Sequence, residues 1–194
     1  MDITSKNSYT LKKIENNAYY LFNLIKRDIP SSILSSINFK FFNNLIQEKI
    51  IHLYIIQYQK KISAIITVIT VKNLQKLKYK IFFFYFINPV KLFFNIIKII
   101  KSLARSSSEH FDKSYLHLLH LVIYKKNFMN VSLKKKDQII EFFLKNILKI
   151  FKAKTLFLCF EKKNIKAHRF YLRNNFIVYK INKDLVFVQK KLIN

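Results

Sequence analysis

The sequence predicts a mixed fold, α/β or α+β, in which helices cover a sheet. Its 194 residues suffice for one domain with a real core, and about half of them are hydrophobic. Runs rich in β-branched and aromatic residues alternate with stretches that have helical periodicity. In the C-terminal half the order is strand, helix, strand, helix, strand, strand. We therefore expect a single domain over residues 1–194.

The N-terminal half predicts two helices and a hairpin. Residues Tyr19 to Lys26 and Ser31 to Glu48 have helical patterns, and Pro30 separates them. The runs IIHLYIIQY (50–58) and ISAIITVITV (62–71) predict strands, because both are rich in β-branched residues. The polar QKK between them predicts the hairpin turn.

An insertion at about residues 73–108 follows the hairpin. From Lys91 its polar residues recur at helical spacing, which predicts a basic amphipathic helix over about 89–105. Residues Ile81 to Ile100 are long enough to span a bilayer, but each lysine near its centre costs roughly 2.5–3.5 kcal/mol. A spanning helix is therefore disfavoured. Packing against the sheet and peripheral contact with a membrane surface both stay open.

The C-terminal half predicts six further elements. The apolar run YLHLLHLVIY predicts a strand, and TLFLCFEK predicts another. Between them lies a helix with one apolar face and lysines elsewhere. A short helix and two strands joined at Asn182-Lys183-Asp184 complete the chain.

Glycine is absent, and Lys, Asn, Ile and Phe dominate, as AT-rich codons would produce. Backbone positions that need positive φ must then fall to Asn or Ser, or be avoided. The formal net charge is +26, yet arginine occurs only at positions 27, 105, 169 and 173. Since nucleic-acid modules rely on arginine, this composition argues against nucleic acid and favours an acidic or phosphorylated small ligand.

Cysteine and the N-terminal segment bear on the compartment. Cys159 is the single cysteine, which excludes an internal disulfide and predicts a buried thiol. The opening residues 1–17 are polar rather than a signal peptide. Both observations predict a cytoplasmic protein.

The segment NIKAHRFYLRNNF carries the most specific pattern. It has the spacing Asn-x-x-Ala-x-x-Phe-Tyr and ends in Asn-Asn-Phe, directly after a predicted strand. With the strand, loop and helix that precede it, this pattern resembles the GCN5-related N-acetyltransferase (GNAT) family. The resemblance covers most of the chain and is clearest from Tyr115 to Leu192. Six residues match the family motif, and Asn175 stands where the family has glycine: Asn164, Ala167, Phe170, Tyr171, Asn174 and Phe176.

The resemblance implies a GNAT-like sheet of about six to seven strands, mixed and mostly antiparallel, and acetyl-CoA as co-substrate. The pyrophosphate of acetyl-CoA would bind the loop before the long helix, where both family glycines are replaced. Lys125, Lys126 and Lys134 to Lys136 flank this loop as point charges. The loop comprises Asn127, Phe128, Met129, Asn130, Val131 and Ser132.

The resemblance also assigns the pantetheine arm and the chemistry. The arm would pair with the backbone of His120, Leu121 and Val122, and Asn164 would hydrogen-bond it. Tyr171 would protonate the departing thiolate as general acid. The residues alone also allow a structural interpretation of each position. Asn164 would then be a helix N-cap, and Tyr171 would be a core aromatic residue.

The general base has several candidates, which are Glu109, His110, His117 and Glu161. His117 is preferred because it lies on the central strand. His117 and His120 differ in parity along that strand, so they are expected on opposite faces of the sheet, which argues against a metal pair. No zinc spacing occurs in the sequence, and no metal is expected.

The leading hypothesis is an N-acetyltransferase that acts on a primary amine of a small molecule, with a lean toward an amino sugar, or of a protein. The alternative is a degenerate, non-catalytic GNAT-fold protein that serves as a basic binding or membrane-surface module. The two hypotheses differ in whether the loop Asn127 to Ser132 binds acetyl-CoA.

Overall fold

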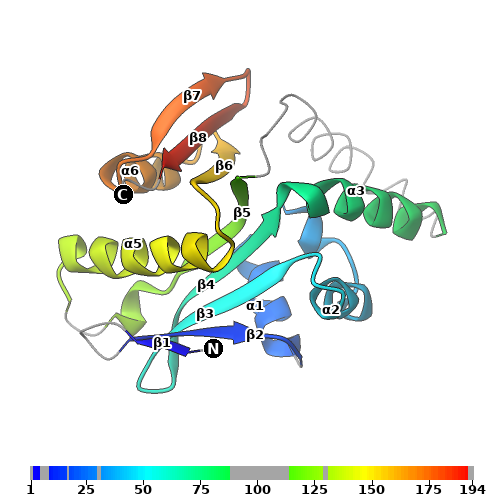
Figure 1. Cartoon of the computed structure of the whole chain (residues 1–194), viewed down its shortest axis with the longest axis horizontal. Helices are drawn as coiled ribbons and strands as arrows, with labels where there is room; N and C mark the ends of the chain where they lie inside the picture. The colour runs from blue at the N-terminus through cyan, green and yellow to red at the C-terminus, as the bar shows by residue number, and fades with distance from the viewer. Residues whose placement is uncertain are drawn as a thin grey trace.

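The computed structural model describes residues 2–4, 9–16, 18–29, 32–87, 114–128 and 131–191. All eight of its strands form one sheet in the order β1-β2-β3-β4-β5-β6-β8-β7 (Figure 1). Every strand pair is antiparallel except β5 with β6. The strands are β1 (Asp2–Thr4), β2 (Thr10–Ile14), β3 (His52–Tyr58), β4 (Lys61–Thr70), β5 (Tyr115–Ile123), β6 (Thr155–Glu161), β7 (Ile177–Ile181) and β8 (Leu185–Lys191).

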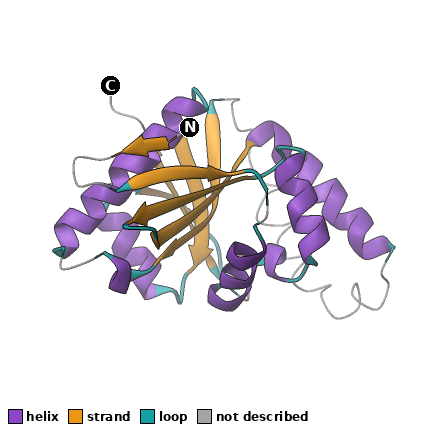
Figure 2. Ribbon diagram, turned by 90° about the horizontal axis from the view of Figure 1, so that it is seen from below, coloured by secondary structure: helices purple, strands orange, loops and turns teal. Residues whose placement is uncertain are grey.

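Helices cover both faces of the twisted sheet (Figure 2). One core lies under α5 and α6, and a second lies under α1, α2 and α3. Ile66 and Val68 of β4 enter the first core, whereas Ile65 and Ile69 enter the second, so β4 is buried on both faces. The helices are α1 (Tyr19–Asp28), α2 (Phe39–Gln47), α3 (Val71–Phe86), α5 (Leu133–Ile150) and α6 (Ile165–Arg173), with 3₁₀ turns η1 (Ile33–Ser35) and η2 (Lys125–Asn127).

The mixed, mostly antiparallel sheet expected from the sequence is confirmed, as is the order of elements after residue 115. The structure adds β1 and β2, which the sequence did not predict, so the sheet has eight strands rather than six to seven. The predicted helix over residues 31–48 is wrong in extent. It is split into η1 and α2, because Asn38 begins a new helix by accepting a 2.8 Å hydrogen bond from the Phe41 N–H.

The insertion also differs from the expectation. Its first part is α3, a helix of 16 residues that begins directly after β4. The amphipathic helix expected over 89–105 lies outside the described residues. Within the part of the chain that is described, no helix combines the length and apolar character that crossing a membrane requires.

Five described residues have positive φ, and they are Lys49, Gln59, Lys60, Lys152 and Asn175. The expectation that Asn or Ser would fill such positions holds only at Asn175. Gln59 and Lys60 form the β3–β4 hairpin turn, a position where glycine is normally favoured. Because the chain has no glycine, Lys and Gln take the left-handed geometry at four of these five positions.

Candidate active site

Strands β5 and β6 diverge, and this divergence is the main feature of the candidate site (Figure 1). They pair in parallel only at Tyr115–Thr155, Leu116–Leu156 and His117–Phe157. Beyond these positions β5 continues beside β4, and β6 continues beside β8. Among the described residues, the edge of β5 from Leu118 to Ile123 therefore has no strand partner on its β6 side. Its main-chain N–H and C=O groups on that side are not bonded to β6.

A β-bulge lies in the diverging part of β5. Val68 pairs with Leu118 and Thr67 with His120, so Leu119 is an extra residue with no direct partner. The bulge interrupts the side-chain alternation of the strand. His117 lies opposite Ile69, and both histidines consequently face the α1–α3 side of the sheet. The prediction that His117 and His120 lie on opposite faces is therefore wrong.

His120 contacts a residue that the sequence did not associate with it. Its Nε2 lies 2.5 Å from Oγ of Ser32, and both side chains are buried. The His120 Nδ1 atom and the hydroxyl of its cross-strand neighbour Thr67 are buried without a hydrogen-bond partner among the described residues. Burial lowers the pKa of His120 to about 4, so the ring is neutral at neutral pH. Ser32 lies 88 positions from His120 in the sequence, and no short-range pattern could have indicated the pair.

His117 lies at the point where β5 and β6 part. Its ring is buried and contacts Phe157 edge to face, with 5.0 Å between the ring centroids. Burial lowers the pKa of His117 to about 4. A neutral imidazole can accept a proton, but one with so low a pKa accepts it weakly.

The loop before α5 uses its side chains to anchor itself. Asn127 donates a 2.7 Å hydrogen bond to the carbonyl of Ile62, and Ser63 donates back to the Asn127 carbonyl at 3.0 Å. Phe128 is fully buried and stacks on Tyr9. These two side chains hold the loop onto β4 and the core rather than toward a ligand. Met129 and Asn130 lie outside the described residues.

The backbone donors of this loop are partly in use. The N–H groups of Asn127, Phe128 and Val131 donate to carbonyls within the segment, at 2.9, 3.2 and 3.1 Å respectively. Ser132 caps α5, and its Oγ accepts a hydrogen bond from the Lys135 N–H at 3.3 Å. The N–H groups of Ser132 and of the first two helical residues have no partner inside the helix. An anion would therefore meet the N-terminus of an 18-residue helix rather than a glycine loop.

Asn164 caps α6, as one of the two interpretations predicted. Its Oδ1 accepts a 3.0 Å hydrogen bond from the Ala167 N–H. The side chain is exposed, and its amide nitrogen makes no hydrogen bond within the described part of the chain. Asn164 can therefore cap the helix and still donate to a ligand.

Helix α6 ends in a Schellman motif. The Asn175 N–H donates to the Leu172 carbonyl at 3.1 Å, and the Phe176 N–H donates to the Tyr171 carbonyl at 3.0 Å. Asn175 has φ 57°, the left-handed geometry that favours glycine. The rings of Phe176 and Tyr171 pack together, which is the hydrophobic contact typical of this motif.

Tyr171 faces inward from α6 and is buried. Its ring stacks on Phe160 of β6, with 5.4 Å between the centroids, so the core-aromatic interpretation of its packing is confirmed. Its hydroxyl makes no hydrogen bond to any described residue. Burial, with a smaller effect of Cys159, raises the pKa of Tyr171. The phenol is therefore protonated at neutral pH and is a weaker acid than an exposed tyrosine.

The predicted residues are divided between the two faces of the sheet. Leu121, Val131 and Tyr171 belong to the core under α5 and α6. His117 and His120 face the opposite side. Among the described residues, no group of three metal-ligating side chains occurs.

Comparison with known proteins places this arrangement in a fold family. No protein-family model matches the sequence, and no curated protein matches it. Solved structures match along nearly the whole chain. The Campylobacter jejuni N-acetyltransferase PseH in complex with acetyl coenzyme A is 15% identical, with a TM-score of 0.54 over 94% of this chain and 98% of that one.

Two further structures match more closely in shape. The Vibrio cholerae spermidine N-acetyltransferase with CoA and spermine is 13% identical, with a TM-score of 0.59 and coverage of 96% of each chain. A GNAT-family acetyltransferase from Listeria monocytogenes has the same identity and TM-score, over 99% of this chain and 100% of that one. The chain therefore has the fold of the GNAT acetyltransferases.

Proposed function

We propose that this protein is an N-acetyltransferase that moves the acetyl group of acetyl-CoA to a primary amine. The divergence of β5 and β6 beyond His117 and Phe157, within a GNAT fold, is the observation that carries the proposal. It leaves a strand edge of peptide groups without a partner from β6, and peptide groups are what the amides of a pantetheine arm can bind. A cytoplasmic location, as the sequence predicts, suits an enzyme that draws on acetyl-CoA.

The cofactor is held by three elements in this proposal. The pantetheine amides pair with the backbone of His120, Leu121 and Val122, and the Asn164 amide donates to the arm. The pyrophosphate binds the N-terminus of α5, where Ser132 and the next residues present N–H groups and the helix dipole favours anions. Exposed Lys134 and Lys135 add charge there in place of the close backbone approach that glycine would allow.

The chemistry is a direct acyl transfer. The amine nitrogen attacks the thioester carbonyl, a C–N bond forms, and the C–S bond breaks. The sulfur leaves as a thiolate and takes the proton of the Tyr171 hydroxyl. His117 is the proposed base for the proton that the amine loses. His120 is a second candidate, because the bulge turns it to the same face.

The charge of the chain bears on the acceptor. A surface with a net charge of +26 repels polycations and attracts anions, so an amine that also carries a phosphate or carboxylate fits better than a polyamine. We therefore favour a small anionic amine, with amino sugars that carry a phosphate or carboxylate as the first group to test.

The second candidate function is a non-catalytic GNAT-fold protein. The loop before α5 favours it, because Asn127 and Phe128 anchor the loop and three of its N–H groups are already bonded. Calorimetric titration with CoA separates the two functions. Absence of CoA binding would leave the non-catalytic function.

If CoA binds, substitution of Tyr171 tests the chemistry. The Tyr171→Phe variant keeps the stacked ring and removes only the acid, so turnover should fall about 100-fold or more with little change in CoA affinity. Tyr54→Phe removes the hydroxyl of another buried tyrosine, on β3, and serves as the matched control. Equal turnover of the Tyr171→Phe variant and the wild type would exclude Tyr171 as the acid.

A further inference from the structure

Helix α3 has two apolar faces, whereas a surface helix needs only one. The first face packs into the core through Leu77, Ile81 and Tyr85. The second face is exposed and consists of Tyr79, Phe82, Phe83 and Phe86, here called the aromatic stripe, whose side chains are 68%, 52%, 59% and 67% exposed. Their spacing of three, four and seven residues places all four on one side of the helix.

The aromatic stripe is a continuous patch rather than scattered residues. The rings of Phe82 and Phe86 stack with 6.1 Å between centroids, and Phe83 meets Phe82 edge to face at the same distance. Ile87, directly after the helix, is 75% exposed and extends the patch. Contiguous exposed apolar surface of this kind marks an interaction site.

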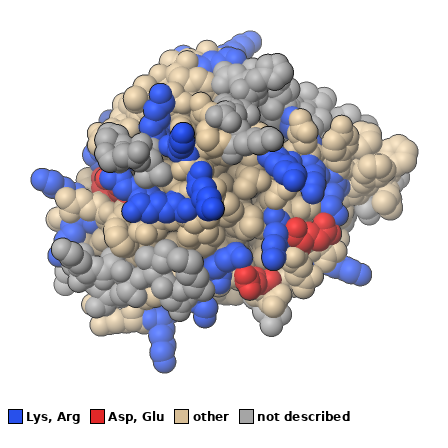
Figure 3. All heavy atoms as spheres, in the orientation of Figure 1, with Lys and Arg blue, Asp and Glu red and all other residues tan. Residues whose placement is uncertain are grey.

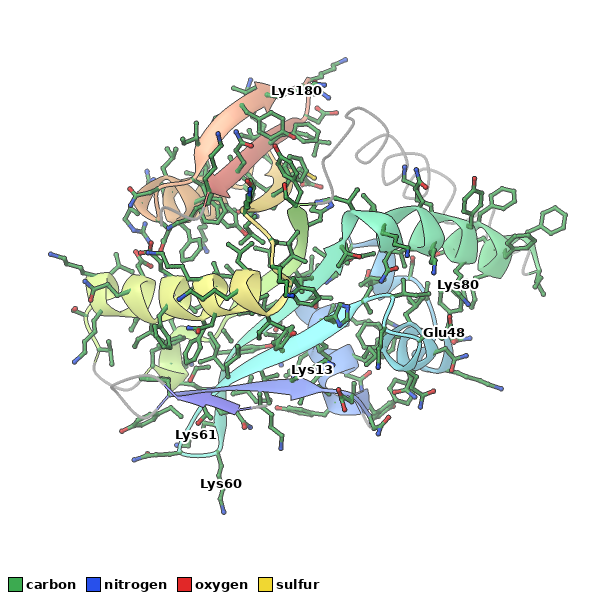
Figure 4. The ribbon with its side chains drawn as sticks, viewed as in Figure 1. Lys13, Glu48, Lys60, Lys61, Lys80 and Lys180 are labelled. Carbon is green, nitrogen blue, oxygen red and sulfur yellow. The ribbon has the colours of Figure 1, made fainter. Side chains whose placement is uncertain are left out.

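Lysines flank the aromatic stripe, and α3 contains no acidic residue. On the helix, Lys72, Lys76 and Lys80 follow one border of the stripe, and Lys78 lies on the other. Lys80 also holds Glu48, which follows α2, in an ion pair of 2.8 Å, and the two side chains lie together in Figure 4. In Figure 3 the end of the molecule that holds α3 shows uncharged surface, with both basic and acidic residues beside it.

We infer that the aromatic stripe docks on an anionic lipid membrane. A helix with aromatic residues on one side and lysines at its borders is the pattern of helices that lie in the plane of a membrane surface. The rings enter the interface between head groups and acyl chains, while the lysines reach the anionic head groups. This inference uses α3 alone and does not depend on the proposed enzymatic activity.

Charge distinguishes a membrane from the other occupants of such a surface. A second copy of this chain would bring the lysines of α3 against one another between two bodies of charge +26, which opposes association. Protein interfaces are enriched in Arg and depleted in Lys, whereas a lipid surface attracts either cation. The lysine border therefore favours lipid.

Tryptophan substitution gives a site-specific test, because the chain has no tryptophan. In the full-length Phe86→Trp variant the new indole is the only one, and Ile181→Trp places it on β7 at a residue of similar exposure. With vesicles of phosphatidylcholine and phosphatidylserine, we expect the emission of the Phe86→Trp variant to shift to the blue and that of the Ile181→Trp variant to stay unchanged. No shift at position 86, or an equal shift at both positions, would overturn the inference.

Vesicle flotation gives an independent test. The Phe83→Gln/Phe86→Gln variant keeps good helix formers and should bind phosphatidylserine vesicles about tenfold less than the wild type. The control Ile177→Thr/Ile181→Thr removes two equally exposed apolar residues from β7 and should bind as the wild type does. Equal loss in both variants would contradict the inference. If the wild type self-associates without lipid and the Gln variant does not, the aromatic stripe binds a second copy of this chain instead.

Discussion

Two regions of the candidate site replace glycine in different ways. Residues 164–176 form the helix, cap and turn that their sequence motif predicts, and Asn175 takes the left-handed conformation of the family's glycine. In residues 117–128 the side chains instead serve the fold. His117, His120 and Phe128 are buried, and Asn127 is bonded to Ile62.

The difference follows from what each glycine does. In the turn after α6 the glycine supplies only a positive φ, and Asn can adopt that conformation at moderate cost. In a pyrophosphate loop the glycines also let the phosphates approach the backbone, and no residue with a Cβ can do so. The first function survives a glycine-free composition, whereas in the function proposed here helix-terminal N–H groups and lysine charge replace the second.

Acid stability is the largest expected effect and tests whether the β5 histidines belong to the core. Their folded pKa values of about 4 lie below the ordinary value of 6.5, so the unfolded chain binds protons first as the pH falls. The free energy of unfolding is therefore unaffected by protonation of these histidines above pH 6.5. It falls toward pH 4, by on the order of 2–3 kcal/mol per histidine. Urea unfolding between pH 6.5 and pH 4 should show this decrease in the free energy of unfolding. In a His117→Leu variant the decrease should be smaller.

A flat profile between pH 6.5 and pH 4 would contradict the burial of these rings. It would mean that both histidines are open to solvent or to a ligand, and that the two regions differ less than the structure indicates.

The lysines at the start of α5 test how the glycine-free loop holds an anion. The Lys134→Gln/Lys135→Gln variant should bind CoA about three- to tenfold more weakly, because charge at the helix N-terminus replaces close backbone contact. The effect should shrink at high salt. Lys154→Gln/Lys183→Gln removes two exposed lysines elsewhere and is the control. Unchanged CoA affinity in the α5 variant would place the pyrophosphate away from this helix.

The smallest expected effect concerns the turn after α6. The Asn175→Gly variant relieves left-handed strain and should raise the free energy of unfolding by about 1 kcal/mol, with CoA affinity unchanged. Asn182→Gly, at a loop residue without positive φ, should give no gain. Guanidinium unfolding of both variants measures the difference. A gain in CoA affinity would show that this turn also shapes the cofactor site.

The order of elements from β5 onward could be predicted because each has strong periodicity and the α6 motif has fixed spacing. Strand β2 was missed because TLKKI buries only Leu11, and the edge position of β1 leaves little apolar signal. The bulge at Leu119 could not be predicted, since pairing register is a property of two strands. The extra residue brings His120 to the same face of the sheet as His117, whereas strict alternation predicts opposite faces. The Ser32–His120 contact was hidden for a related reason, because it joins distant segments.

The left-handed turns at Lys49, Gln59, Lys60, Lys152 and Asn175 also have a consequence for the gene. Glycine codons begin with GG, those for Lys and Asn begin with AA, and those for Gln begin with CA, so no single base change converts any of these residues into glycine. Each strained turn is therefore separated from its glycine variant by an intermediate residue, and that residue relieves little of the backbone strain. The backbone strain is retained by the genetic code as well as by the fold, and gene synthesis can remove it where stepwise mutation does not.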